Sequence, residues 1–291
     1  ARSLQNIRKK GEGVMSKEND IEDHYSHSSL LASIKKGLEK QGKSATNITL
    51  DDIAPIDEFH IGGRQASIDF FEQLNFDSSM NVLDLGCGLG GPARFVAQQF
   101  GCSVTGIDLT TDYIDAGNQL SEWTGLESKV KLTQGSALDL PFQAGSFDVI
   151  YMMHVGMNIR EKERLAKEAF RVLKPRGVFG IYDVMRIGKG DILYPVPWAT
   201  TEKTSALEKP EEYQTYLGAA GFSSLSLRER GTFAQDFFEQ MARKMDNIEG
   251  PPPLGLHLLM GSNAKEKASN VLSMITEGLL APVELIALKV S

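Results

Sequence analysis

The sequence predicts an α/β fold built on a doubly wound, mainly parallel sheet, and three observations lead to this prediction. Apolar strand segments alternate with helical segments from residue 66 to about residue 184. A glycine-rich turn, Gly86–Gly91, follows the first of these strands and leads into a helix. An acidic residue, Asp108, ends the next strand, at the sheet edge where such folds bind ligands.

The first strand and its turn are the centre of this pattern. Val82, Leu83 and Leu85 form the apolar run of a buried parallel strand. The glycines after it let the turn tighten and let a ligand approach the backbone, and Pro92 suits the first turn of the next helix. We therefore expect free backbone N–H groups here, ready to bind an anionic or hydrogen-bond-accepting group.

The other core elements follow in order. Strands are expected at Ser103–Leu109, Val130–Thr133, Phe147–Met153 and Val178–Val184, helices at Ala66–Leu74, Arg94–Phe100, 111–123 and 161–173, a loop at Gln134–Phe142 and a turn at Lys174–Gly177. Alternation at this spacing predicts a sheet covered by helices on both faces.

The two ends of the chain depart from this alternation. Ser28 or Ser29 caps an expected helix that carries Leu30, Ile34 and Leu38 on one face, and a glycine-containing loop, Ile56–Arg64, precedes the core. The later elements are expected to be helices at 210–220, 233–245 and 263–280 and strands at 223–230 and 283–290. The two late strands predict a hairpin added to one edge of the sheet.

Composition points to a small-molecule ligand. The chain has 291 residues with 41% hydrophobic and 24% charged residues, as in ordinary globular proteins. A net charge of −7 argues against nucleic acid, and no apolar run approaches the ~20 residues that span a membrane. Two cysteines fit a reducing compartment, and Cys87 is read as a small turn residue in preference to a nucleophile. We expect a cytoplasmic protein, with an organellar location left open because residues 1–13 are basic.

The glycine turn alone leaves the cofactor open. Gly86, Gly88 and Gly91 satisfy the G-x-G-x-x-G spacing of nicotinamide and flavin dinucleotide sites. No Tyr-x-x-x-Lys pair or other dehydrogenase-like catalytic group accompanies it. The surrounding motifs therefore have to decide.

Those motifs form an ordered set at 82–91, 106–108, 140–142, 147–150 and 173–177. Over about residues 55–185 the set resembles class I S-adenosylmethionine-dependent methyltransferases. The resemblance implies an enzyme that uses S-adenosylmethionine, with S-adenosylhomocysteine as product and no metal. It also implies a Rossmann-like, seven-stranded, mostly parallel sheet with an antiparallel edge strand and helical cap insertions. We divide the chain into an N-terminal tail with lid helices (1–54), a cofactor-binding core (55–190), and substrate or cap helices with the two final strands (191–291).

The resemblance also implies roles for residues of the core. Asp84 would orient the turn or receive the methionine ammonium through water, unless it is only a strand-end cap. Gly86 and Gly88 would admit the methionine part, Asp108 would accept both ribose hydroxyls, and Leu109 would lie against the adenine.

Two further segments are implied in cofactor binding. Ser136, Ala137 and Leu138 would meet the adenine edge, although many relatives carry Asp in place of Ser136. Gly62 and Gly63 resemble a second glycine loop that closes on the methionine carboxylate, with a plain turn as the alternative.

The acceptor is suggested by a narrower resemblance. The segments 57–64, 151–159, 183–186 and 195–198 resemble sarcosine and dimethylglycine N-methyltransferases, which make glycine betaine as an osmolyte. A small amine with a carboxylate is therefore the expected substrate, and a single arginine can bind such a carboxylate bidentately.

Candidate residues for this acceptor lie near the predicted sheet edge. Arg186 is the first candidate for holding the carboxylate and Arg64 the second. Asn158 would orient the amine or the carboxylate, and His154 would lie beside the cofactor unless it is only structural. Aromatic rings near a quaternary product nitrogen stabilise it, and the candidates for this role are Tyr25, Phe59, His60, Tyr194 and Trp198.

Two other functions stay open. The first is methyl transfer to a larger apolar acceptor, such as a tocopherol-like phenol or a sterol, with the helices at 233–245 and 263–280 lining a broad cleft. The second is a cofactor-binding module without turnover. The pattern allows either a monomer or a dimer.

Overall fold

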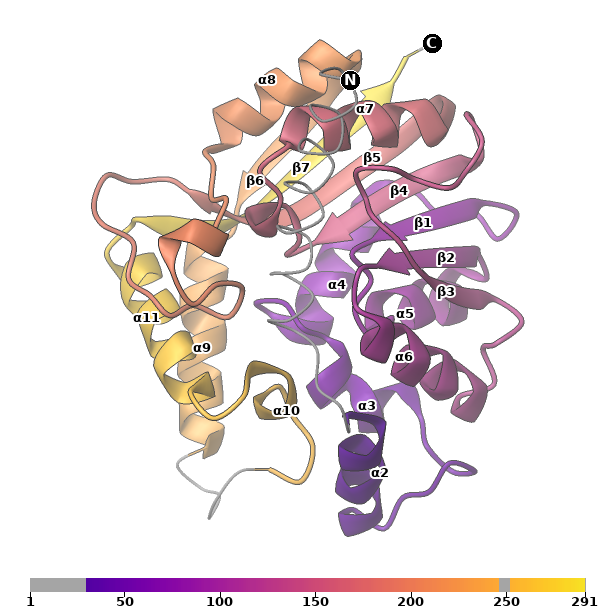
Figure 1. Ribbon diagram of the computed structural model, residues 1–291, viewed down its shortest axis with the longest axis vertical. Coiled ribbons are helices and arrows are strands. Elements are labelled where there is room, and N and C mark those ends of the chain that lie inside the picture. Colours follow the sequence, from indigo (N-terminus) through magenta and orange to yellow (C-terminus); the bar gives the residue numbers. More distant parts are fainter. Residues whose placement is uncertain (1–29, 246–251, 291) are drawn as a thin grey trace, which may run out of the picture.

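The computed structural model describes residues 30–245 and 252–290, and its centre is a seven-stranded sheet (Figure 1). The strand order is β3-β2-β1-β4-β5-β7-β6. The strands are β1 Asn81–Leu85, β2 Ser103–Asp108, β3 Val130–Gln134, β4 Phe147–Met153, β5 Leu173–Arg186, β6 Phe222–Glu229 and β7 Leu280–Lys289. The predicted α/β fold and each of the predicted strands are confirmed.

Strand direction changes only at the late edge of the sheet. β1 pairs in parallel with β2 and β4, so the carboxyl ends of these three strands share one edge. β7 lies between β5 and β6 and pairs with both in antiparallel fashion, which confirms the predicted edge hairpin. The expected turn at Lys174–Gly177 lies within β5, where Arg176 keeps a turn-like φ of 65°.

Helices cover both faces of the sheet. α4 Gly63–Phe71, η1 Glu72–Leu74 and α5 Gly91–Phe100 lie toward one face, and α7 Lys162–Val172 and α8 Pro210–Ala220 pack together on the other (Figure 1). Alternating side chains of β1 reach the two cores, because Leu83 and Leu85 join one apolar cluster and Val82 joins the opposite one. α6 Thr111–Trp123 packs beside β2 and β3.

The remaining helices lie beyond the carboxyl edge of the parallel strands. They are α2 Leu30–Lys40 and α3 Leu50–Asp57 from the N-terminal part, and α9 Gly231–Met245, α10 His257–Met260 and α11 Ala264–Thr276 from the C-terminal part (Figure 1). None of the helices in residues 30–245 and 252–290 combines the length and apolar character that crossing a bilayer requires.

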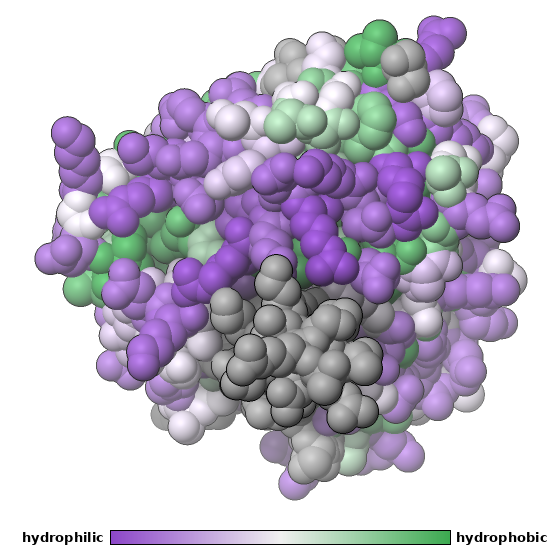
Figure 2. All heavy atoms as spheres, turned by 45° about the horizontal axis from the view of Figure 1, so that its top comes forward, coloured by the Kyte–Doolittle hydropathy of each residue, from purple (hydrophilic) through white to green (hydrophobic). Residues whose placement is uncertain are grey.

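The face of the molecule shown in Figure 2 is mainly hydrophilic, with smaller hydrophobic areas between. Most apolar side chains lie in interior clusters instead. The large apolar side chains that are exposed among the described residues are Ile187, Leu193, Leu227, Met241 and Val290.

Two helices differ from the sequence prediction. α3 occupies a segment where no helix was predicted, and its last two residues belong to the expected loop Ile56–Arg64. Thr49 and Asp52 form a reciprocal capping box that starts α3, and this spacing was a readable signal. The short helix α10 was not predicted. The predicted cap at Ser28 or Ser29 lies outside the described residues.

A buried ion pair connects α3 to the glycine turn. Arg94 of α5 is fully buried, and its Nη2 lies 2.5 Å from both Asp57 Oδ1 and the carbonyl oxygen of Leu89. Its Nη1 donates to the Gly117 carbonyl (2.8 Å) and Ser121 Oγ (3.0 Å) of α6. Burial raises the pKa of Asp57 to about 6 and the charge of Arg94 limits the rise, so the carboxyl group is ionised at neutral pH.

We predict that Asp57→Ala lowers the free energy of unfolding by about 3–5 kcal/mol, because it leaves a buried guanidinium without its counter-charge. Urea unfolding followed by circular dichroism measures this. Glu239→Ala removes the exposed partner of Arg243 and serves as the matched control, with little change expected. Similar losses for the two variants would contradict the prediction.

Candidate active site

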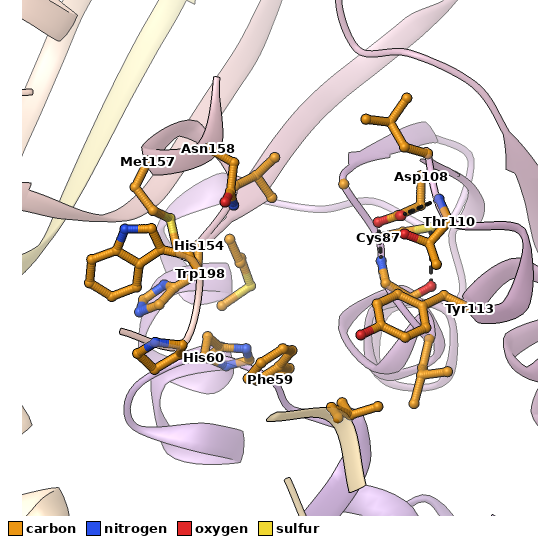
Figure 3. Close-up of a pocket in the computed structure, with 18 of the residues that line it drawn as sticks. Phe59, His60, Cys87, Asp108, Thr110, Tyr113, His154, Met157, Asn158 and Trp198 are labelled. Carbon is orange, nitrogen blue, oxygen red and sulfur yellow. Dashed lines mark hydrogen bonds between the residues drawn. The ribbon is translucent and has the colours of Figure 1, made fainter. Parts of the chain in front are cut away.

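A cavity of about 690 Å³ lies at the carboxyl ends of β1, β2 and β4. Figure 3 shows Cys87, Asp108, Thr110 and Tyr113 on one side of it and His60, His154, Met157, Asn158 and Trp198 on the other. The first group comes from the glycine turn and the segment that begins at the end of β2, and the second from loops after α3, β4 and β5. The cavity therefore has two distinct halves.

The glycine turn uses its own N–H groups. Gly86 N and Cys87 N donate to the Ile107 carbonyl at 2.8 and 3.1 Å, Gly88 N donates to Asp108 Oδ2 at 2.9 Å, and Gly90 N donates to the Cys87 carbonyl at 2.8 Å. The N–H groups of these four residues, which precede α5, are therefore not free, whereas the prediction concerned the N-terminus of the helix itself. Gly86, Cys87 and Gly88 bind β2 with their N–H groups, and Gly90 closes the turn on Cys87.

The N-terminus of α5 is also covered. A Cβ atom on Gly91 would lie 2.1 Å from the Asp57 carbonyl oxygen and 2.7 Å from the Asp57 carboxyl carbon. A dinucleotide site needs this helix end for the pyrophosphate. Here the carboxylate of Asp57 already lies there, so the G-x-G-x-x-G spacing does not make a pyrophosphate site.

Gly88 and Asp108 shape the half of the cavity nearer β2. Gly88 has a φ of +52°, and a Cβ atom there would meet nothing within 4 Å, so a ligand can approach its backbone. Asp108 Oδ1 accepts from Thr110 N (2.9 Å) and lines the cavity with lone pairs remaining on both oxygens. Burial raises its pKa, although the backbone N–H groups of Thr110 and Gly88 oppose this. A pair of hydroxyl donors fits this carboxylate.

Asp84 lies beneath the turn and reaches the same cavity. It is 2% exposed and accepts a hydrogen bond from Tyr151 Oη at 3.1 Å. Burial raises the pKa of Asp84 to about 8, with the tyrosine hydrogen bond opposing and the nearby Asp108 adding to the rise. The ligand-free protein therefore holds Asp84 mainly protonated at neutral pH.

Most predicted cofactor residues line this half of the cavity, namely Asp84, Gly86, Gly88, Asp108, Leu109, Ser136, Ala137 and Leu138. Gly62 and Gly63 do not line it, because they form the turn that starts α4 and a Cβ on Gly62 would collide with Phe233. Sequence reasoning missed Thr110 and Tyr113 as lining residues, although Thr110 directly follows the Asp108–Leu109 pair.

On the opposite side of the cavity, Asn158 has a side-chain oxygen that could accept a hydrogen bond. It ends η2 Gly156–Asn158, which is tied to the β5–α8 loop by a hydrogen bond from Ala206 N to the Met157 carbonyl (2.6 Å). Asn158 Oδ1 is buried and has no hydrogen-bond partner among the described residues. His60, His154 and Trp198 line the same half.

The predicted arginines lie elsewhere. Arg186 is absent from the described lining of the cavity, and its guanidinium donates to the carbonyls of Gly188 and Gly190. Arg64 is also absent, and its Nε lies 2.5 Å from Glu58 Oε1. The geometry thus gives no support to a carboxylate clamp at either position. Tyr194 packs in an apolar cluster beside the cavity, and Tyr25 lies outside the described residues.

Helices from the C-terminal part close this half with apolar side chains. The apolar lining residues on this side include Met157, Trp198, Phe237, Phe238 and Val271, which share one apolar cluster. Leu256 and Leu259 also line the cavity, but they pack with Leu89 and Tyr113 beside the glycine turn. Sequence reasoning left Met241, Leu256, Leu259 and Met260 as either the wall of an apolar cleft or the core of a cap.

Comparison with known proteins assigns the core. Residues 83–181 match the family model of the methyltransferase domain. A sterol 24-C-methyltransferase of Gibberella zeae is 38% identical over 104 residues, which cover 36% of this chain and 27% of that protein. The methyltransferase GfsG of Streptomyces halstedii is 27% identical over 179 residues, covering 60% of this chain and 64% of that protein. The chain thus matches about a quarter of the length of the sterol relative.

Solved structures share the fold. Geranyl diphosphate C-methyltransferase from Streptomyces coelicolor, solved with S-adenosyl-L-homocysteine, has a TM-score of 0.68 and 16% identity, with 94% of this chain and 97% of that chain covered. A putative sarcosine dimethylglycine methyltransferase from Galdieria sulphuraria has a TM-score of 0.63 and 20% identity, with 77% and 85% covered.

The family match and the fold agree with the geometry of the cavity. Residues 83–181 match the methyltransferase domain, and the chain shares its Rossmann-like fold with methyltransferases solved with S-adenosylmethionine or S-adenosylhomocysteine. The half of the cavity formed by Gly88 and Asp108 fits such a cofactor, because it offers a carboxylate for hydroxyl groups and no phosphate site. We call this half the cofactor half, and the opposite one the acceptor half.

We predict that Asp108→Asn weakens S-adenosylhomocysteine binding about tenfold to a hundredfold, because a hydrogen bond to a charged group contributes roughly 1.5–3 kcal/mol. Isothermal titration calorimetry measures the affinity. Asp115→Asn, an exposed position on α6, is the matched control. Unchanged affinity in the Asp108 variant would remove this residue from the cofactor site.

We predict that S-adenosylhomocysteine binds more tightly as the pH rises from about 6 to about 9. A ligand ammonium group prefers ionised Asp84, and the raised pKa means that binding at neutral pH has to remove a proton. Titration in buffers of different ionisation enthalpy detects the released proton. Asp84→Asn should bind more weakly and lose this dependence, and a variant that keeps it would show that another group is responsible.

Proposed function

We propose that the protein is an S-adenosylmethionine-dependent methyltransferase whose acceptor is a large, mainly apolar molecule, a sterol or a tocopherol-like phenol. The observation that carries this proposal is the acceptor half of the cavity. Apolar side chains from α9 and α11 line it, together with Met157 and Trp198. A cavity lined in this way gains binding free energy from apolar surface.

The charges around the cavity argue against the small amino-acid acceptor that the sequence first suggested. Among the described lining residues the only Lys or Arg side chains are Arg160 and Lys203, and both are exposed to solvent. Arg160 is also bound to the carbonyls of Glu202 and Lys203. A substrate carboxylate placed inside the acceptor half would therefore lose hydration without gaining a buried cation.

The comparisons support the same choice. The sequence relatives at 38% and lower identity include several sterol 24-C-methyltransferases. The sarcosine dimethylglycine methyltransferase is a neighbour in fold, at 20% identity. Another neighbour in fold, at 22% identity, is the [4+2]-cyclase SpnF, so methyl transfer itself needs a direct test.

The residues of this chain have a limited set of tasks in such a reaction. The bound cofactor supplies an electrophilic methyl group on a sulfonium. Gly88 and Asp108 hold the cofactor, while Trp198 and the apolar wall exclude water and align the acceptor. Alignment of this kind contributes about 7–11 kcal/mol through effective molarity.

The test is a methyl-transfer assay with radiolabelled S-adenosylmethionine. The panel contains a sterol with a side-chain double bond, a tocopherol-like phenol, sarcosine and dimethylglycine, with the lipids in detergent micelles. We expect labelled lipid and no labelled amine. Methylation of the amines alone would contradict the proposed acceptor class. If the protein binds the cofactor but methylates none of the compounds, the proposal that it methylates these acceptors is wrong.

We predict that Phe238→Ala raises the KM for the apolar acceptor about tenfold to a hundredfold, because a buried Phe side chain contributes roughly 1.5–3 kcal/mol. Cofactor affinity should not change. Phe76→Ala, at a half-buried position outside the described lining, controls for a general loss of packing. A larger effect of the control variant would contradict the role given to α9.

A further inference from the structure

His60 lies in the loop between α3 and α4 and lines the acceptor half, on the same side as His154 and Trp198 (Figure 3). The proposed function gives it no task. Its neighbours, however, fix which of its two nitrogens carries a proton. The role that these contacts indicate for His60 rests on the proposed function.

The tautomer of His60 is set by its hydrogen bonds. Nε2 lies 3.1 Å from the Gly63 carbonyl oxygen, which can only accept, so Nε2 carries the proton. Ser67 Oγ lies 3.2 Å from the same nitrogen. Nδ1 has no hydrogen-bond partner among residues 30–245 and 252–290, so its lone pair is left for a molecule in the cavity.

A buried carboxylate, that of Glu58, lies next to the Nε2 side of the His60 ring. Glu58 is 3% exposed, and its Oε2 accepts from Ser67 Oγ at 2.7 Å and lies 3.4 Å from His60 Nε2. Its other oxygen lies 2.5 Å from Arg64 Nε. A carboxylate on the protonated nitrogen stabilises the imidazolium that forms when the other nitrogen takes up a proton.

His154 is not equivalent to His60. Its Nε2 accepts from Ile61 N at 3.2 Å, and its Nδ1 lies 3.4 Å from the Tyr182 carbonyl oxygen, so both nitrogens have a partner. Burial lowers the pKa of His154 to about 3, and the neighbouring His60 adds to this effect. His154 therefore stays neutral and fixes the backbone at Ile61, next to His60.

We propose that His60, oriented by Glu58, is the general base of the reaction and that the acceptor is methylated at a hydroxyl group. Two hydrogen-bond-accepting atoms in the apolar acceptor half, His60 Nδ1 and Asn158 Oδ1, have no partner among the described residues. A hydroxyl group on the substrate would donate the hydrogen bond that they lack. A phenol fulfils this condition at its reacting atom, whereas the side-chain double bond of a sterol does not.

The step balances without a further reactant. The acceptor oxygen forms a bond to the methyl carbon while the bond between that carbon and the sulfonium sulfur breaks. The electron pair of the broken bond stays on sulfur, which becomes a thioether. The hydroxyl proton moves to His60 Nδ1, and the positive charge passes from the sulfonium to the imidazolium, beside Glu58.

The charged and titratable groups around His60 predict its pH behaviour. Burial lowers the pKa of His60, Glu58 raises it, and Arg64 lowers it, while His154 and Tyr182 face it from the sheet. The base is active when neutral, so kcat/KM should fall as the pH drops through the pKa of His60. Glu58→Gln removes the raising charge and should move this fall to lower pH.

The experiment measures methyl transfer to a tocopherol-like phenol and to its methyl ether, with wild type, His60→Gln, Glu58→Gln and the control His257→Gln, which lies outside the described lining. Thermal unfolding and S-adenosylhomocysteine affinity check that each variant is folded. We expect His60→Gln to lower kcat about 10²- to 10⁴-fold, with unchanged cofactor affinity and normal activity of the control. The methyl ether should not react.

The outcomes separate this inference from the proposed function. If wild type and His60→Gln methylate the phenol equally well, His60 is not the general base, while the proposed apolar acceptor class remains supported. Methylation of the ether, or of a sterol double bond, at the rate of the phenol overturns the hydroxyl. Methylation of the amines alone overturns both. If His60→Gln does not fold, the pH profile of Glu58→Gln tests the inference. A fall of kcat/KM at the same pH as in wild type would contradict the pairing of Glu58 with His60.

Discussion

The ion pair between Arg94 and Asp57 is the constraint on which the rest of the site depends. A guanidinium with no exposed surface holds the end of α3, the glycine turn and α6 through one set of hydrogen bonds. The same contact places the Asp57 carboxylate at the N-terminus of α5. A buried charge of this kind is costly unless it is fully paired, so the three elements have to meet in one arrangement. The Asp57 carboxylate at this helix end disfavours the pyrophosphate of a dinucleotide there.

The two halves of the cavity are lined by different parts of the chain. Strand ends of the sheet supply Asp84, Gly88 and Asp108, which are rigidly placed by β1 and β2. The acceptor half is built from loops and from α9 and α11, which lie outside the sheet. The first part lies within residues 83–181, which match the methyltransferase domain, while α9 and α11 lie outside that match. An acceptor assigned from the core alone is therefore weakly supported.

The sequence was informative wherever the cause of a structure is local. Apolar runs identify the strands, glycine spacing identifies the turn, and Asp108 is found because it ends a strand beside that turn. The sequence was misleading where partners are distant or where a nearby group competes. Asp57 is 37 residues from Arg94, and no periodicity shows that they meet. Arg186 does end β5 as expected, but the carbonyls two and four residues further on bind its guanidinium. α3 was missed although the capping box of Thr49 and Asp52 is a local signal for its start.

We infer that the turn after β1 and the carboxylate at the end of β2 bind S-adenosylmethionine in preference to a dinucleotide. Equilibrium dialysis of the wild-type protein against radiolabelled S-adenosylmethionine, with unlabelled S-adenosylhomocysteine or NAD as competitor, tests this without any assumption about the acceptor. We expect saturable binding that S-adenosylhomocysteine displaces and NAD does not. Displacement by NAD at equal concentration, or no saturable binding of S-adenosylmethionine, would contradict it.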